Sequence, residues 1–133
     1  MIALLDTNTC IFLLNQANPA VRTQFEARSP SDIALCSIVK AELLFGAYRS
    51  KRVDANRQRL GAFFAPLQCF GFDDDCAEHY ALIRADLMAQ GQPIGPNDLM
   101  IAATARANDA ILVTNNTKEF SRVAGLRLED WTA

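Results

Sequence analysis

The sequence predicts an α/β fold, a single domain built as an α/β sandwich around a mainly parallel sheet. Short apolar runs of strand length alternate with amphipathic stretches of helical spacing, which is the pattern of repeated strand and helix units. At 133 residues, half of them apolar, the chain can bury one core of ordinary size. No internal repeat, low-complexity stretch or linker interrupts it, so we expect one domain over residues 1–133.

The first quarter of the chain begins the alternation of strand and helix. The apolar run at residues 2–5 predicts the first strand. Residues 7–9, Thr-Asn-Thr, can cap a short helix over residues 10–14, because hydroxyl and amide side chains accept hydrogen bonds from free helix N–H groups. A second helix runs from the Asn-Pro pair at 18–19 toward Arg28, with proline in its tolerated first-turn position.

The middle of the chain predicts two more strands and two more helices. Residues 33–37 form the second strand, and the helix after it carries Glu42 in its first turns. Another helix spans residues 54–64 and ends before Pro66, and residues 67–72 form the third strand. The helix after the second strand is identified by apolar residues at helical spacing, which are Val39, Leu43, Leu44 and Ala47.

The last third predicts two helices and one strand. Three consecutive aspartates begin a helix over residues 76–90, because carboxylates suit the positive end of the helix dipole. A loop rich in Gly and Pro then leads to Asp98, which opens an apolar, alanine-rich helix over residues 99–107. Residues 110–114 have the composition of a buried strand, and residues 115–120 form the loop after it.

The composition argues against several classes of protein. The N-terminus has no basic region or cleavage site, and no apolar run approaches the roughly 20 residues of a membrane span, so we expect a soluble, cytoplasmic protein. The four cysteines form no C-x-x-C pair, and with one histidine they offer too few ligands for zinc. We expect reduced, mostly packed thiols. His79 has no nucleophile signature beside it, which argues against a triad hydrolase.

The charge distribution leaves one question open. A net charge of −2 argues against a surface that binds nucleic acid all over. A local basic track is nevertheless present, with five cations within eleven residues: Arg49, Lys51, Arg52, Arg57 and Arg59. This track fits either a solvated corner between two helices or contact with nucleic acid.

Four acidic residues lie where a predicted strand ends or a helix begins: Asp6, Glu42, Asp98 and Glu119. In a parallel sheet with right-handed crossovers these positions meet at one edge, beyond the carboxyl ends of the strands. Carboxylates this close repel one another unless a cation lies among them, and oxygen clusters are the ligands that Mg²⁺ and Mn²⁺ prefer. We therefore expect a divalent-metal site that activates water against a phosphodiester.

Each acid also has an ordinary structural interpretation. Asp6 fits a turn or a cap, Glu42 a solvated helix surface, and Asp98 a helix N-cap. Glu119 has cations close by in the sequence as surface partners. The functional interpretation therefore rests on the combination of the four.

Four segments carry a resemblance that extends over essentially the whole chain. They are LLDTN at residues 4–8, IVKAELLFGA at 38–47, PIGPNDLMIAA at 93–103 and VTNNTKEF at 113–120. Together, in this order and spacing, they resemble the PIN-domain ribonucleases, specifically the VapC toxins. The tail at residues 122–131 is similar to the end of a VapC toxin as well.

The resemblance implies a three-layer α/β/α domain with Mg²⁺- or Mn²⁺-dependent endoribonuclease activity. In that family, acids matching Asp6, Glu42 and Asp98 form the core of the site, and Asp6 and Asp98 are the first choices as direct metal ligands. Some relatives place an aspartate near Asn116, where this chain has an amide. The fourth role is therefore expected either to pass to Glu119, which would complete the site, or to be partly lost.

The resemblance also implies surroundings and partners for the site. Thr7, Thr114 and Asn116 are expected to orient ligands or water from around the metal-binding residues. A VapB-like antitoxin from the same operon would occupy a groove of the toxin, and the toxin would form a homodimer. Apolar residues at 11–14 and 43–48 fit either that groove or the core. The N-terminal and Gly-Pro-Asn-Asp segments resemble the branch that cuts initiator transfer RNA.

Three other functions compete with this one. A phosphatase of the haloacid dehalogenase type also ends its first strand in aspartate, but it needs a second acid where this chain has Asn8. A receiver domain needs an acidic pair before the end of the first strand, which residues 2–5 do not provide. It also needs a lysine directly after a late strand, for which Lys118 is only a loose match. A degenerate PIN fold that only binds would have no need to keep Asp6, Glu42 and Asp98 together.

Overall fold

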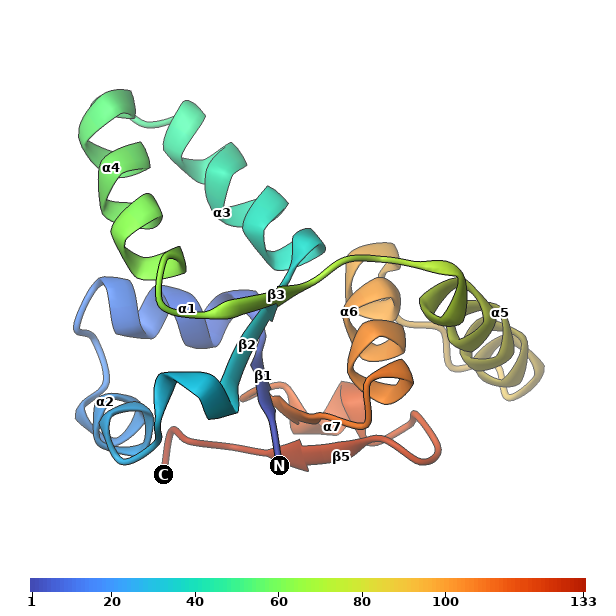
Figure 1. The fold of residues 1–133 in the computed structure, drawn as a ribbon. Coiled ribbons are helices and arrows are strands. Elements are labelled where there is room, and N and C mark those ends of the chain that lie inside the picture. Colours follow the sequence, from blue (N-terminus) through green and yellow to red (C-terminus); the bar gives the residue numbers. More distant parts are fainter.

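A five-stranded, wholly parallel sheet forms the centre of the protein in a computed structural model, which describes residues 1–133 (Figure 1). The strands are β1 (Ala3–Leu5), β2 (Ile33–Cys36), β3 (Gln68–Phe70), β4 (Ile111–Val113) and β5 (Arg127–Glu129). Their spatial order is β3-β2-β1-β4-β5, and every neighbouring pair is parallel. The predicted α/β fold is confirmed, and the sheet is all parallel rather than mainly parallel.

The strand order reverses at β1. From β1 the chain moves outward through β2 to β3, and it then returns to place β4 on the other side of β1. Leu4 of β1 lies opposite Ala34 of β2 and Leu112 of β4. Ligands of open parallel sheets bind beyond the carboxyl ends of the strands at such a reversal, so the ends of β1 and β4 mark the edge where a site is expected.

Helices flank the sheet on both sides, as the three-layer expectation requires (Figure 1). They are α1 (Thr7–Leu14), α2 (Pro19–Glu26), α3 (Ser37–Tyr48), α4 (Val53–Phe64), α5 (Asp74–Ala89), α6 (Pro96–Ala107) and α7 (Thr117–Phe120), with a 3-10 turn at Pro30–Asp32. In Figure 1, α3 and α4 form a hairpin that projects from the body, while α5 and α6 pack together on the other side. None of the helices has both the length and the apolar character that a bilayer crossing demands.

Side-chain caps fix where several helices begin. The Asn18 carboxamide accepts from the backbone N–H groups of the first turn of α2, and the Asp73 carboxylate accepts from Cys76 N at the start of α5, as predicted. The first helix differs from the prediction, because α1 begins at Thr7 and not at residue 10. The reason is that Asp6 is extended and caps the helix itself, with its Oδ1 accepting from Thr9 N at 2.8 Å.

The C-terminal third departs most from the predicted elements. Helix α6 begins at Pro96, three residues earlier than predicted, because proline is preset for the first helical position. The predicted loop at 115–120 contains the one-turn helix α7, which buries Phe120. Strand β5 was not predicted at all, and it pairs with β4 through Leu128 opposite Leu112. The predicted strands at 33–37, 67–72 and 110–114 are each one to three residues shorter in the structure.

The core lies between the central strands and the helices. Strands β1 and β2 are buried along their full length, as expected of parallel strands covered on both faces. Helix α6 packs closely because its inner face is made of small residues, as the alanine-rich sequence predicts. Its core residues are Leu99, Ile101, Ala102, Ala103 and Ala105.

The cysteines are free thiols, and three of them are buried. Burial raises the pKa of the Cys36 thiol to about 11 and holds that of Cys10 well above its ordinary value, so both stay protonated and unreactive. Cys76 is also buried, whereas Cys69 is exposed on β3, an edge strand of the sheet. The expectation of reduced, mostly packed thiols is confirmed, with Cys69 as the exposed one.

Truncating the centre of β1 tests this packing. Leu4 is fully buried between the two neighbouring strands, so Leu4→Ala should lower the free energy of unfolding by about 3 kcal/mol. Leu82→Ala removes the same atoms from a side chain that is 61% exposed, and it should change stability by less than about 0.5 kcal/mol. Urea denaturation measures both, and similar losses in the two variants would contradict the assigned core.

Candidate active site

Four chain segments bring the predicted acids to the carboxyl edge of the sheet. Asp6 directly follows β1, and Glu42 lies in the second turn of α3, which follows β2. Asp98 lies in the first turn of α6, and Glu119 lies in α7 just beyond β4. Asp98 therefore sits inside its helix and is not the N-cap, a position that Gly95 takes.

The other three carboxylates lie near enough to Asp98 to affect its ionisation. Its pKa is raised to about 6, first by burial and then by the negative charges of Glu119, Glu42 and Asp6. Like charges raise a carboxyl pKa only when they are close. The structure therefore brings together all four acids that the sequence singled out.

Asp6 is held more firmly than an acid on a surface loop. Its side chain is buried, with the residue only 5% exposed, and caps α1 as described above. Its backbone N–H donates to Val113 O of β4 at 3.1 Å, and the Thr9 hydroxyl donates to the same carbonyl at 3.2 Å. Both interpretations of Asp6, cap and site residue, thus apply at once, because the cap uses only one carboxylate oxygen.

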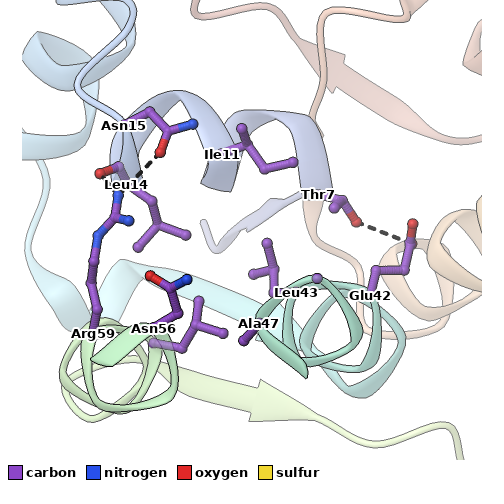
Figure 2. Close-up of a pocket in the computed structure, with 11 residues that line it drawn as sticks. Thr7, Ile11, Leu14, Asn15, Glu42, Leu43, Ala47, Asn56 and Arg59 are labelled. Carbon is purple, nitrogen blue, oxygen red and sulfur yellow. Dashed lines mark hydrogen bonds between the residues drawn. The ribbon is translucent and has the colours of Figure 1, made fainter. Parts of the chain in front are cut away.

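A hydroxyl group positions the Glu42 carboxylate. Thr7 Oγ1 donates to Glu42 Oε1 at 3.0 Å, a contact that joins the start of α1 to α3 (Figure 2). Glu42 is half-buried, so it is not the freely solvated charge of the alternative interpretation. Thr7 lies where the sequence analysis expected it, directly against a predicted ligand.

Glu119 is positioned by an amide and not by a cation. Asn116 Nδ2 donates to Glu119 Oε2 at 2.7 Å, and the backbone N–H of Asn116 donates to the Thr114 hydroxyl at 2.9 Å. The neighbouring cations Lys118 and Arg122 form no ion pair with Glu119, since the three ion pairs of the protein lie elsewhere. Asn116 thus orients the fourth acid instead of replacing it.

The donor set suits a hard divalent cation, although the side chains do not form a closed cage. No three His, Cys, Asp or Glu side chains are placed to hold one ion together. Three of the four carboxylates use one oxygen each in the bonds above, so each keeps a second oxygen for a ligand. The Asp98 carboxylate has no hydrogen-bonding partner in the chain, and burial together with the negative charges of the other three acids raises its pKa. Oxygen donors with excess negative charge fit Mg²⁺ or Mn²⁺.

The remaining acids and the histidine have other roles. Asp73 caps α5, while Asp109 and Glu129 form ion pairs with arginines. His79 Nδ1 accepts a hydrogen bond from Arg106 Nε at 2.8 Å. These contacts agree with the ordinary interpretation of helix starts and exposed faces, and with the absence of a catalytic triad.

A cavity of about 330 Å³ lies beside Glu42, between α1 and the α3–α4 hairpin (Figure 2). Its apolar wall is formed by Ile11, Leu14, Leu43, Ala47 and Leu60. At the far end, the Arg59 guanidinium donates to Leu14 O and to Asn15 Oδ1 across the two helices. The apolar segments at 11–14 and 43–48 therefore line a groove, and Leu43 and Ala47 belong to the core as well. The role of Arg59 was not predicted from the sequence.

Comparison with known proteins gives consistent matches along the chain. A sequence model of the family described as "PIN domain" matches residues 3–126. The chain is 40% identical to the "tRNA(fMet)-specific endonuclease VapC" of Shigella flexneri over 129 residues, 97% of each chain. It is also 40% identical to "Ribonuclease VapC2" of Rickettsia felis over 132 residues, 98% of each chain.

Solved structures agree with these sequence matches. The crystal structure of VapBC2 from Rickettsia felis, bound to a DNA fragment from their promoter, contains a chain similar to this one with a TM-score of 0.92. The identity is 39%, over 98% of this chain and 99% of that one. The DNA-bound VapBC of Salmonella typhimurium gives a TM-score of 0.92 at 37% identity, over 98% of each chain.

Because Asp98 is partly buried near three other carboxylates, replacing it with a neutral residue should stabilise the fold, by an amount that depends on pH. Its folded pKa of about 6 lies above the ordinary value of 3.8. The carboxyl is protonated in both states only well below its ordinary pKa of 3.8, so the cost to folding is absent there, grows between that value and the folded pKa of about 6, and stays constant above. In chelator at pH 7.5, Asp98→Asn should therefore be more stable than wild type by about 1–2 kcal/mol, a value discounted for partial exposure.

Urea denaturation of both proteins at pH 7.5 and near pH 4 measures this difference. Most of the gain should be lost at the lower pH, which lies close to the ordinary pKa of 3.8. An Asp98→Asn protein that is no more stable than wild type at pH 7.5 would contradict the close approach of the four acids.

Proposed function

Because the chain belongs to the VapC ribonucleases of the PIN-domain family, we propose that it cleaves RNA at the carboxylate centre formed by Asp6, Glu42, Asp98 and Glu119. It is an endoribonuclease toxin, and its partner is a VapB-like antitoxin. The proposal goes further in assigning the four acids, the divalent cation and the RNA that is cut. The observation that carries it is the convergence of four carboxylates at the carboxyl edge of the sheet, from the end of β1 and from α3, α6 and α7, where the other three add to the effect of burial in raising the pKa of Asp98.

Asp6 and Asp98 are the first ligands that we assign to the cation, with Glu42 beside them and Glu119 completing the site. When bound, Mg²⁺ or Mn²⁺ would supply a water nucleophile of lowered pKa and stabilise charge on the scissile phosphate. The chain orients the acids before any substrate arrives, through Thr7 on Glu42 and through Asn116 on Glu119. Fixing ligands in advance by such outer hydrogen bonds is a common way for proteins to tune a metal site.

We further propose initiator transfer RNA as the substrate. Two relatives that span nearly the whole chain, from Shigella flexneri and Salmonella typhimurium, are named tRNA(fMet)-specific endonucleases and are 40% and 38% identical to it. A toxin with this substrate acts in the cytoplasm, where we place the protein. The homodimer implied by the family is part of the same proposal, and light scattering on the purified protein tests it.

Removing one charge from the centre tests the site and the metal together. Asp98→Asn should keep the fold and lower the rate of RNA cleavage by about a hundred-fold or more, because a charge-stabilising group is lost. Cleavage of purified total transfer RNA with Mg²⁺ or Mn²⁺, and with chelator as a blank, measures the effect. Asp32→Asn is the matched control, because Asp32 is exposed before β2, at the opposite edge of the sheet.

Two results would count against this proposal. Full activity in a folded Asp98→Asn protein would remove Asp98 from the site. Cleavage that persists in chelator would remove the divalent cation. The Asp32→Asn control should cleave as fast as wild type in either case.

The cavity of Figure 2 is the groove that we assign to the antitoxin. Its wall is apolar and its mouth adjoins Glu42, so a segment bound there lies next to the carboxylate centre. Ile11→Lys places a charge in that wall and should weaken binding of the VapB-like antitoxin while RNA cleavage continues, because Ile11 is not one of the acids.

Phe72→Lys is the matched control, since Ile11 is 39% and Phe72 38% exposed. Calorimetric titration with the antitoxin measures both variants. Equal antitoxin affinity in the two would show that the groove is not the binding site.

A further inference from the structure

The α3–α4 arm, residues 37–64, has a charge unlike that of the rest of the protein. It carries six of the thirteen Lys and Arg residues and only two of the fifteen acids, a net charge of +4. The chain as a whole has a net charge of −2, so the remainder carries −6. Figure 1 shows the arm projecting from the body, so a positive element stands out from a negative one.

Aromatic rings are exposed on the arm beside its cations. Phe45 and Tyr48 are 61% and 59% exposed, which is unusual for large aromatic side chains with a core available. The Arg49 guanidinium lies 5.5 Å from the centre of the Phe45 ring, and that of Arg57 lies 5.3 Å from the Tyr48 ring. Neither arginine forms an ion pair, since the ion pairs of the protein lie elsewhere. Alternating rings and unpaired cations are what single-stranded nucleic acid binds, by stacking its bases and pairing its phosphates.

The exposed rings lead to the carboxylate centre. Phe45 follows Glu42 by one turn of α3, and both line a cavity of about 270 Å³ between α3 and α6. Asn97 and Met100 form the opposite wall, next to Asp98 in the first turn of α6. A strand held on the arm would therefore reach the acids without leaving the protein surface.

Charge favours RNA over a second copy of this chain on the same face. A two-fold dimer places identical surfaces against each other, and here it would set one positive arm against another. A polyanion such as RNA is instead attracted to the arm, because each phosphate that pairs with a cation releases counterions and so favours binding. The exposed residues Lys51 and Arg52 at the tip of the hairpin extend the positive surface in the same way.

We propose that the α3–α4 arm holds an unpaired segment of the RNA substrate, with Phe45 and Tyr48 stacking on bases and Arg49, Arg52 and Arg57 pairing with phosphates. This inference rests on the proposed ribonuclease function and adds a substrate-binding surface outside the four acids. Of the two interpretations of the basic track, it takes contact with nucleic acid for all members except Arg59, whose guanidinium donates to Leu14 O and Asn15 Oδ1. The arm residues are positioning residues, and the acids remain intact in every variant tested for cleavage.

Binding is measured first, in the Asp98→Asn background, so that the probe is not cut. The probe is a fluorescein-labelled, unstructured oligoribonucleotide, and anisotropy gives its affinity at several salt concentrations. Phe45→Ala should weaken binding by about 5- to 100-fold, the range of one lost base stack. The double variant Arg49→Gln with Arg52→Gln should also flatten the salt dependence, by about 0.7 in logarithmic slope for each phosphate that no longer pairs with a cation.

Arg84→Gln is the matched control. The Arg84 guanidinium lies 6.0 Å from the centre of the Tyr80 ring, so the two form the same kind of arginine–aromatic pair as those of the arm. Both residues belong to α5, outside the arm. The Arg84→Gln variant should bind the probe like the Asp98→Asn parent. Circular dichroism and light scattering confirm that each variant is folded and has the parent's oligomeric state.

Cleavage of transfer RNA by the same arm variants, with all four acids present, completes the test. A raised KM with kcat nearly unchanged supports the arm as a binding surface. Arm variants that bind and cleave like Arg84→Gln overturn the inference and leave the ribonuclease function untouched. A change of oligomeric state in Phe45→Ala also overturns it, because the face would then be an interface between copies. If wild type cuts no RNA while binding still depends on the arm residues, the proposed ribonuclease function is contradicted, and the RNA-binding role of the arm is supported.

Discussion

Mutual repulsion among four carboxylates is the constraint that the rest of the structure has to accommodate. Asp6, Glu42, Asp98 and Glu119 come from segments far apart in the chain, and the parallel sheet brings them to one edge. No basic side chain neutralises them, and the burial and negative surroundings of Asp98 raise its pKa to about 6. A fold that keeps such a cluster loses stability at neutral pH unless a cation is bound. This repulsion supports the role that we propose for the cluster, a binding site for a divalent cation.

The framework around the acids is made of neutral hydrogen bonds. Asp6 is fixed by capping α1, Glu42 by the Thr7 hydroxyl, and Glu119 by the Asn116 amide. Neutral donors orient a carboxylate without cancelling its charge, which is what the proposed cation site requires. Helix α3 contributes to two cavities, because Glu42 borders both the groove beside α1, which we assign to the antitoxin, and the cavity between α3 and α6.

Local signals in the sequence predict what depends on local chemistry. The apolar runs predict four of the five strands, and the Asn-Pro pair at 18–19 and the aspartates at 73–75 predict the starts of two helices. Strand β5 was missed because its residues Arg127–Glu129 are mostly polar and are ordered by pairing with β4. The contact of Arg59 with Asn15, 44 residues away, and the rings beside the arm's arginines depend on how helices face each other. No pattern along the chain specifies those orientations.

Calorimetric titration with Mn²⁺ at pH 7.5 tests the central claim most directly, because it measures cation binding by the acids without RNA. Wild type and the Asp32→Asn control should bind the ion alike. Asp98→Asn should bind it more weakly by at least the roughly 10- to 100-fold that is lost when an outer partner of a metal ligand is removed. Equal affinity in all three folded proteins, or no binding by wild type, would contradict the assignment of the four carboxylates as a metal centre.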